Sequence, residues 1–157
     1  MKNIWFYKTP IGKIGIASEN ETIIGILFEN SKIIENAQEK ETPIIKKCHQ
    51  QLMEYFNQER THFNLPLAIN GTDFQNKVWN ALMDIPYGST CSYKDIALKI
   101  NNEKAVRAVG LANNKNYIPI IIPCHRVIGT SGKLVGYAGG LEMKQYLLDL
   151  EKTNADK

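Results

Sequence analysis

The sequence predicts an α+β protein, with a small N-terminal α/β domain followed by a mostly helical C-terminal domain. Two observations carry this prediction. In the first 28 residues, apolar side chains alternate or run together in short segments, a pattern typical of strands. After residue 42 they recur every three or four positions, as on the buried face of a helix. A chain of 157 residues is long enough for two small domains.

The N-terminal strands are separated by recognisable turns. We expect strands over residues 4–7, 13–17 and 22–28. The first turn, residues 9–12, contains a proline and a glycine, and residues 18–21 connect the second pair. A polar segment without an assigned strand follows over residues 29–41.

The first helix has a clear start signal. Thr42 is a suitable N-cap, and Pro43 fits the first helical position. The pattern predicts a helix over residues 43–57 that buries Ile44, Cys48, Leu52 and either Tyr55 or Phe56. Asn70-Gly71 then breaks the pattern, and we place the boundary between domains 1–70 and 71–157 there.

Four helices are predicted in the second domain. Thr72-Asp73 caps the first, whose apolar positions are Phe74, Val78, Trp79 and Leu82. The others are expected over residues 93–100, capped by Ser92, and over residues 103–112 and 141–151, with a frayed tail after Lys152. Two short helices joined by a tight turn fit a helix-turn-helix motif. Helices that only pack against each other, without forming a nucleic-acid-binding motif, fit the pattern equally well.

Charge and composition restrict the function. Residues 1–70 hold 8 basic and 8 acidic side chains, whereas residues 71–157 hold 11 and 8, so the second domain carries the net charge of +3. This bias suits a polyanionic partner such as nucleic acid. No apolar stretch approaches the roughly 20 residues that span a bilayer, and residues 1–5 lack the features of a signal peptide, so we expect a cytoplasmic protein.

The three cysteines and three histidines do not form a metal-binding pattern. Cys48, Cys91 and Cys124 are far apart, and the histidines are scattered, so no metal site is expected. Cys48 is interpreted as a small core residue and Cys91 as structural.

The segment Ile122-Pro123-Cys124-His125-Arg126-Val127 is the strongest chemical signal. It places a thiol beside an imidazole after an apolar run. Such a pair can produce a thiolate, which is the nucleophilic form of cysteine. The motif alone leaves open what the sulfur attacks.

With its surroundings, this segment resembles the O6-alkylguanine-DNA alkyltransferases, also called methylated-DNA–protein-cysteine methyltransferases. The resemblance covers residues 72–151 closely. It is carried by Thr72-Asp73-Phe74-Gln75, Val78-Trp79, Ile85-Pro86-Tyr87-Gly88, Ser92-Tyr93, Arg107-Ala108-Val109-Gly110, Asn116, residues 119–127, Tyr137 and Gly139-Gly140. It implies a ribonuclease-H-like α/β domain before a winged helix-turn-helix domain that bears the active site.

The resemblance implies direct repair of alkylated DNA. The Cys124 thiolate would take the alkyl group from O6 of guanine, or from O4-methylthymine, in duplex DNA. Because a thioether does not hydrolyse, the protein would be consumed in one irreversible turnover. The expected partner is duplex DNA with alkylated bases, and the resemblance implies no cofactor, no metal and no membrane; we expect a monomer.

The resemblance also assigns roles around the thiol. His125 would accept the thiol proton through a water, and Glu151 would orient the imidazole and stabilise its charged form. Tyr93 would line the guanine pocket and support the leaving base. The other pocket residues would be Val127, Tyr137, Ala138 and Asn116. Many relatives have a serine where Ala138 stands, so a backbone amide is the expected donor in that loop.

DNA contacts are implied for the helix predicted over residues 103–112. Arg107 would enter the gap left by a flipped nucleotide, and Tyr93 would also contact the DNA. The small residues Ala108 and Gly110 would let the helix backbone approach the duplex. Arg126 is expected in a structural ion pair.

Two other functions remain open at this point. A cysteine hydrolase could use Cys124 and His125, although hydrolases usually place the histidine far away in the sequence. A binding module, either a helix-turn-helix regulator or a lesion sensor, is the second alternative. The presence of Cys124 argues against a sensor.

Overall fold

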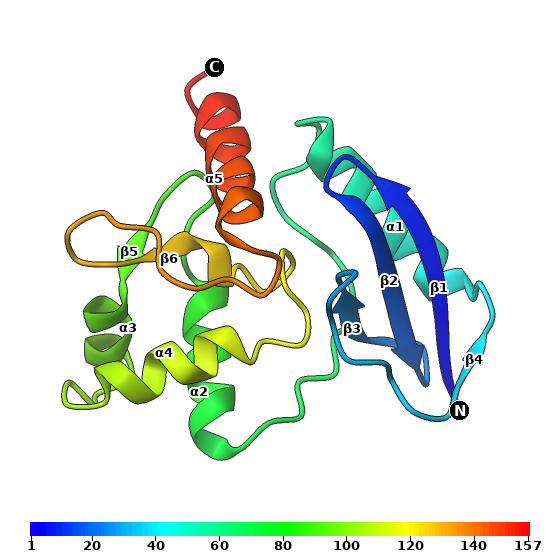
Figure 1. Ribbon diagram of the computed structural model, residues 1–157, viewed down its shortest axis with the longest axis horizontal. Coiled ribbons are helices and arrows are strands. Elements are labelled where there is room, and N and C mark those ends of the chain that lie inside the picture. The colour runs from blue at the N-terminus through cyan, green and yellow to red at the C-terminus, as the bar shows by residue number, and fades with distance from the viewer. The chain divides into compact units, whose positions relative to one another are not determined.

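The computed structural model describes residues 1–157, and its contacts divide the chain into two units, Met1–Ile69 and Asn70–Lys157. Each unit has its own buried apolar residues and a mixture of helix and strand, so the α+β prediction is confirmed (Figure 1). None of the helices combines the length and apolar character that crossing a bilayer requires.

The first unit contains a four-stranded sheet of order β3-β2-β1-β4. Its strands are β1 (Lys2–Thr9), β2 (Gly12–Glu19), β3 (Thr22–Leu27) and β4 (Ala37–Glu39). β1, β2 and β3 form antiparallel neighbours. At the turn between β2 and β3, Asn20 and Glu21 both have positive φ, the geometry that follows the twist of a tight hairpin.

β4 pairs in parallel with β1 and lies in the polar segment where the sequence assigns no strand. Its three residues are half-buried or exposed, so no apolar pattern marks them. Their pairing with residues near the N-terminus is a long-range contact that a local pattern cannot indicate.

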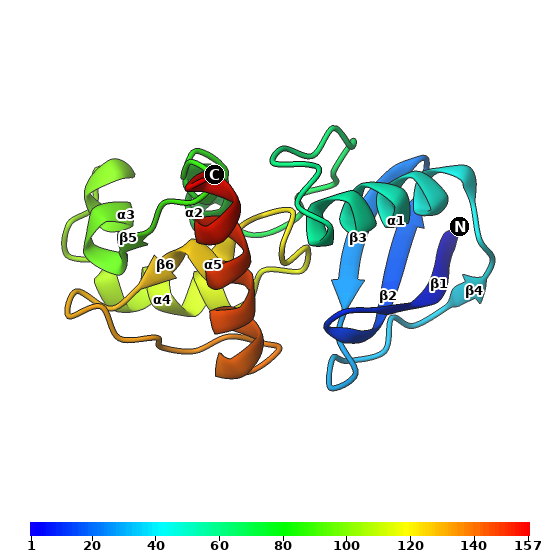
Figure 2. The same cartoon turned by 90° about the horizontal axis from the view of Figure 1, so that it is seen from above.

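One face of the sheet is covered by α1 (Pro43–Phe56), as Figure 2 shows. The predicted start is confirmed: the Thr42 side chain accepts a hydrogen bond from the amide of Ile45, and Pro43 occupies the first turn. Ile45 is buried and Ile44 only half-buried, so the prediction for Ile44 was wrong. The buried residues are Ile45, Cys48, Gln51, Leu52, Tyr55 and Phe56. They lie at mixed intervals of three and four, which follow the 3.6-residue turn better than a constant interval of four.

The second unit begins with α2 (Asp73–Met83), which packs against α3 (Tyr93–Lys99) and α4 (Val106–Asn114). Thr72 and Ser92 cap α2 and α3 through capping boxes, in which side chain and backbone satisfy each other reciprocally. The buried Trp79 ring joins α2 to α4, because its Nε1 donates to the carbonyl of Ala112 at 2.8 Å.

Two helix boundaries differ from the prediction. α4 begins at Val106, not at Glu103, and because its N-cap residue, Ala105, has no side-chain acceptor, no start signal marks this position in the sequence. α5 (Leu141–Ala155) continues beyond Glu151. The prediction of a frayed tail after Lys152 was therefore wrong, because the chain is helical up to Ala155.

Two short strands connect the helices to the segment that contains Cys124. β5 (Cys91–Ser92) pairs in parallel with β6 (Val127–Ile128), which follows the 3₁₀ turn η1 (Cys124–Arg126). Because α3 starts directly after β5, this pairing brings Tyr93 into the neighbourhood of the thiol segment.

Candidate active site

The backbone before Cys124 is held by a side chain. Asn116 Nδ2 donates to the Ile122 carbonyl at 2.7 Å, and its Oδ1 accepts from the Ile118 amide at 2.9 Å. Between these residues, Ile120 has a φ of 74°, a left-handed conformation that is strained for a β-branched residue. Asn116 thus fixes an otherwise unfavourable loop at the point where it leads into η1.

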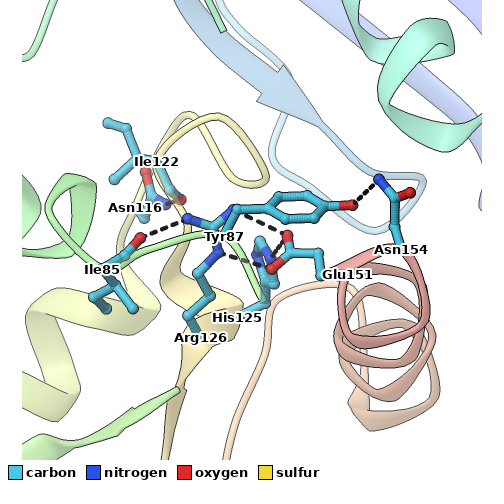
Figure 3. Close-up of polar contacts among 8 residues, drawn as sticks. All are labelled: Ile85, Tyr87, Asn116, Ile122, His125, Arg126, Glu151 and Asn154. Atoms are coloured by element: carbon cyan, nitrogen blue, oxygen red, sulfur yellow. Dashed lines mark hydrogen bonds and ion pairs between the residues drawn. The ribbon is translucent and has the colours of Figure 1, made fainter. Parts of the chain in front are cut away.

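Glu151 of α5 lies beside two consecutive residues of η1, as Figure 3 shows. Its Oε2 is 2.6 Å from His125 Nε2. Arg126 donates to the same carboxylate through Nε at 2.8 Å and Nη2 at 3.1 Å, and through Nη1 to the Ile85 carbonyl at 2.7 Å. The ring of Tyr87 lies 5.6 Å from the guanidinium carbon. The expected structural ion pair of Arg126 is therefore present, with Glu151 as its partner.

The carboxylate determines the state of the histidine. Burial alone would raise the pKa of Glu151, but the hydrogen bonds and positive charges of His125 and Arg126 lower it to about 2. Burial lowers the pKa of His125, and the neighbouring Glu151 opposes this shift. A neutral imidazole that donates from Nε2 to a carboxylate keeps its lone pair on Nδ1. Nδ1 is buried and has no hydrogen-bond partner, so it is available as a base.

Cys124 is 5% exposed, and its thiol is protonated at rest. Burial raises the pKa of Cys124 to about 11, while Asn116 and the charge of Lys144 act in the opposite direction. A reaction at this sulfur therefore requires removal of its proton when the substrate is bound.

Lys144 is a functional candidate that the sequence analysis missed. Its side chain is completely buried, and Nζ donates to the carbonyls of Val127 at 2.7 Å, Val135 at 3.0 Å and Gly136 at 3.3 Å. Burial lowers its pKa, and the nearby Cys124 raises it. A signal was available, because Lys144, Leu147 and Glu151 form one stripe of α5 at intervals of three and four.

Two tyrosines come near the thiol. The Tyr93 hydroxyl donates to the Val135 carbonyl at 2.9 Å, and burial and the nearby Cys124 raise its pKa. Burial, followed by Cys124 and Glu151, raises the pKa of Tyr137 well above its ordinary range. Both tyrosines therefore lie close enough to Cys124 for its charge to raise their pKa.

The remaining predicted pocket residues are a buried valine and a loop alanine, and the structure adds an asparagine that was not among the predicted pocket residues. Val127 is fully buried, and Ala138 is exposed in the loop before α5. Asn113 of α4 is also buried; its Nδ2 donates to the Cys124 carbonyl at 3.4 Å, and its Oδ1 has no partner. A carbonyl has two lone pairs, so Cys124 and Val127 can each accept another hydrogen bond.

The DNA-binding candidates lie on α4. Arg107 and Ala108 are exposed, whereas Gly110 is half-buried. A side chain at Gly110 would meet the Tyr93 ring at 3.8 Å. No group of three or more histidine, cysteine or acidic side chains in residues 1–157 has an arrangement suited to a metal ion.

Two family models match consecutive parts of the chain. The ribonuclease-like domain of 6-O-methylguanine DNA methyltransferase matches residues 5–69, and the DNA binding domain of the same family matches residues 73–153. The chain belongs to the 6-O-methylguanine DNA methyltransferase family. The two-domain architecture expected from the resemblance is therefore confirmed.

Other members of the family are similar along almost the whole chain. The constitutive methylated-DNA–protein-cysteine methyltransferase of Bacillus subtilis is 47% identical over 152 residues, which cover 92% of each chain. The methylated-DNA–protein-cysteine methyltransferase of Methanosarcina acetivorans is 47% identical over 148 residues, covering 92% of this chain and 95% of the relative. The crystal structure of Mycobacterium tuberculosis OGT in complex with DNA superposes with a TM-score of 0.92 at 42% identity, covering 97% of this chain and 94% of OGT.

Proposed function

We propose that this protein repairs DNA by moving an alkyl group, typically methyl, from O6 of guanine in a duplex to Sγ of Cys124. O4-methylthymine is the second expected substrate. The observation that carries the proposal is the buried thiol next to the His125–Glu151–Arg126 network, in a chain of this methyltransferase family. The protein is expected to act as a cytoplasmic monomer that needs neither a metal nor a cofactor.

The first step removes the thiol proton. Nδ1 of His125 accepts it through a water molecule, because consecutive side chains do not face each other directly. Glu151 stabilises the resulting imidazolium, as the third member of a catalytic triad does. The ammonium group of Lys144 lowers the free energy of the thiolate in a site where burial opposes negative charge.

The second step exchanges one bond for another. A bond forms between Cys124 Sγ and the alkyl carbon, while the bond from that carbon to O6 breaks and its electron pair remains with guanine. Tyr93 and the backbone amides of residues 137–140 support the charge on the leaving base. The proton that His125 took from the thiol then passes to the anionic base. This leaves neutral guanine in the DNA and a thioether on the protein.

Recognition of the base uses groups beside the thiol. The carbonyls of Cys124 and Val127 accept from the exocyclic amine of guanine, which adenine lacks at that position. Asn116 keeps the segment before Cys124 in place, and Tyr137 and Ala138 contribute the loop over the pocket. Because O6 lies inside the base stack, the nucleotide must flip out of the duplex, at a cost of a few kcal/mol. Arg107 fills the gap, and Ala108 and Gly110 allow the approach of α4.

Mass spectrometry of the intact protein tests the proposal. After incubation with a duplex that contains O6-methylguanine, each wild-type molecule is expected to gain the mass of one methyl group, located on Cys124. Cys124→Ala should gain nothing, and Cys91→Ala, a matched control, should react like the wild type. An unchanged wild-type mass, or product that keeps forming beyond one equivalent of protein, would refute the proposal and favour a sensor or a hydrolase.

A further inference from the structure

The solvent-facing side of α4 exposes a large apolar side chain that the fold does not use. Leu111 is 61% exposed in the middle of the helix. It is four residues after Arg107 and three after Ala108, so the three side chains are neighbours on one face. Val109 and Ala112 point into the core instead. Leu111 therefore contributes little to the stability of this unit, and it lies beside Arg107, the residue expected to contact DNA.

The charge around this face indicates the partner. The segment from Tyr93 to Asn116 contains two acidic residues, Asp95 and Glu103. Its basic residues are Lys94, Lys99, Lys104, Arg107 and Lys115. Five positive and two negative charges give +3, the same as the net charge of the entire chain. A basic helical segment with this balance complements the phosphates of DNA.

We propose that the Leu111 side chain acts as an apolar wedge. On duplex DNA it packs into the minor groove beside Arg107. The inference rests on the proposed function and extends its DNA contacts beyond Arg107, Ala108 and Gly110. Proteins that bind the minor groove insert apolar side chains, leucine among them, between base steps and partly unstack them. The small Ala108 leaves room for the helix backbone to come close enough for Leu111 to reach the bases.

The wedge acts on the step that precedes chemistry. Unstacking the base pairs next to the lesion lowers the cost of turning the nucleotide out, and Arg107 then occupies the space. Leu111 should therefore matter for a lesion in a duplex but not for the free base O6-benzylguanine, which needs no flipping. Because leucine neutralises no phosphate, it should not affect the salt dependence of binding.

The test compares Leu111→Ala with Leu98→Ala, which removes another exposed leucine, 48% exposed on α3. We expect Leu111→Ala to weaken binding to a duplex about tenfold, as loss of a buried apolar contact does. In Leu111→Ala, the rate of transfer from a lesion in a duplex, divided by the rate of transfer from O6-benzylguanine, should fall by a similar factor. The slope of log K against log salt should stay at the wild-type value, whereas Lys104→Gln, which removes a basic side chain before α4, should reduce it. Leu98→Ala should behave like the wild type.

A second variant separates a wedge from a solvated leucine. Leu111→Lys adds a positive charge, so an uninvolved position would give tighter binding and unchanged transfer from a duplex. A wedge predicts slower transfer from the duplex even where the added charge restores affinity. Duplex binding and transfer within twofold of wild type for Leu111→Ala, or equal losses in Leu98→Ala, would overturn the inference. Failure of the proposed function looks different, because wild-type protein would then not acquire a methyl group at all.

Discussion

Glu151 is the residue on which the network beside the thiol depends. One carboxylate, 1% exposed, binds Arg126 through two nitrogens and His125 through one. Removing one partner from such a buried network leaves another charge without its counter-ion, which is strongly destabilising, so each partner depends on the others. The same contacts that orient the imidazole therefore also stabilise this part of the fold.

Replacing Glu151 should have a large and pH-dependent effect on stability. Glu151→Gln leaves the Arg126 charge buried without its counter-ion, which we expect to cost about 3–5 kcal/mol in urea unfolding at neutral pH. The pKa of Glu151 is about 2 in the folded protein and about 4.3 when unfolded. Its contribution is therefore present above pH ~4.3 and is lost as the pH falls towards 2.

Glu142→Gln, an exposed carboxyl in the first turn of the same helix, is the matched control and should change stability by less than about 1 kcal/mol. The acid-induced loss between pH ~4.3 and 2 should be smaller in Glu151→Gln than in wild type. Parallel stability curves for the two proteins would contradict the role of this carboxylate.

His125 should determine the pH dependence of methyl transfer. Burial lowers its pKa, so in wild type the base should protonate, and the rate fall, only below pH 6.5. In His125→Ala the rate should drop about 10²–10⁴-fold at neutral pH. It should then rise with pH towards the pKa of Cys124, about 11. The exposed His62 provides the control variant His62→Ala, and an unchanged profile in His125→Ala would exclude the imidazole as the base.

The sequence predicted the functional roles of some of these side chains better than those of others. Cys124 and His125 are adjacent in a distinctive motif, and the family resemblance pointed to Glu151. Lys144 was missed because a single lysine on an amphipathic helix usually faces water. The fold shows that its ammonium group donates to the Val127 carbonyl of β6 and to the Val135 and Gly136 carbonyls of the loop before α5.

At the scale of elements, helix starts were predictable where a side chain caps them. Thr42, Thr72 and Ser92 accept the hydrogen bonds that the pattern predicts. Ala105 cannot, and the start of α4 was misplaced by three residues. β4 was missed for a related reason, since its partner strand lies far away in the sequence and its own residues carry no pattern.

The cap of α3 offers a test at this scale. Ser92 Oγ accepts from the Asp95 amide at 3.0 Å, and the Asp95 carboxylate accepts from the Ser92 amide at 2.9 Å. Ser92→Ala should cost about 1 kcal/mol in thermal or urea unfolding. Ser89→Ala, at an exposed serine in the preceding turn, should be close to neutral. Equal stability of the two variants would show that the box contributes nothing.

At the scale of the whole molecule, the two units differ in charge. Residues 1–70 are neutral overall, and residues 71–157 carry the excess of three positive charges. The sequence reveals this asymmetry without any structure. It predicts that the electrostatic part of DNA binding belongs to the second unit.

Salt titrations of duplex binding can check this division. Lys104→Gln, before α4, should reduce the slope of log K against log salt by about one. Lys8→Gln, at a lysine of the first unit that is also exposed, should leave the slope unchanged. A reduction by Lys8→Gln as large as that by Lys104→Gln would place phosphate contacts on both units.

The position of α5 in the chain has a consequence for biosynthesis. Glu151 comes 26 residues after His125, and Lys144 also follows the thiol. A ribosome therefore completes Cys124 well before the helix that provides both charged neighbours. Until α5 has been made and has docked, the imidazole of His125 lacks its carboxylate partner, so the complete charge network beside the thiol can form only after α5 has been synthesised.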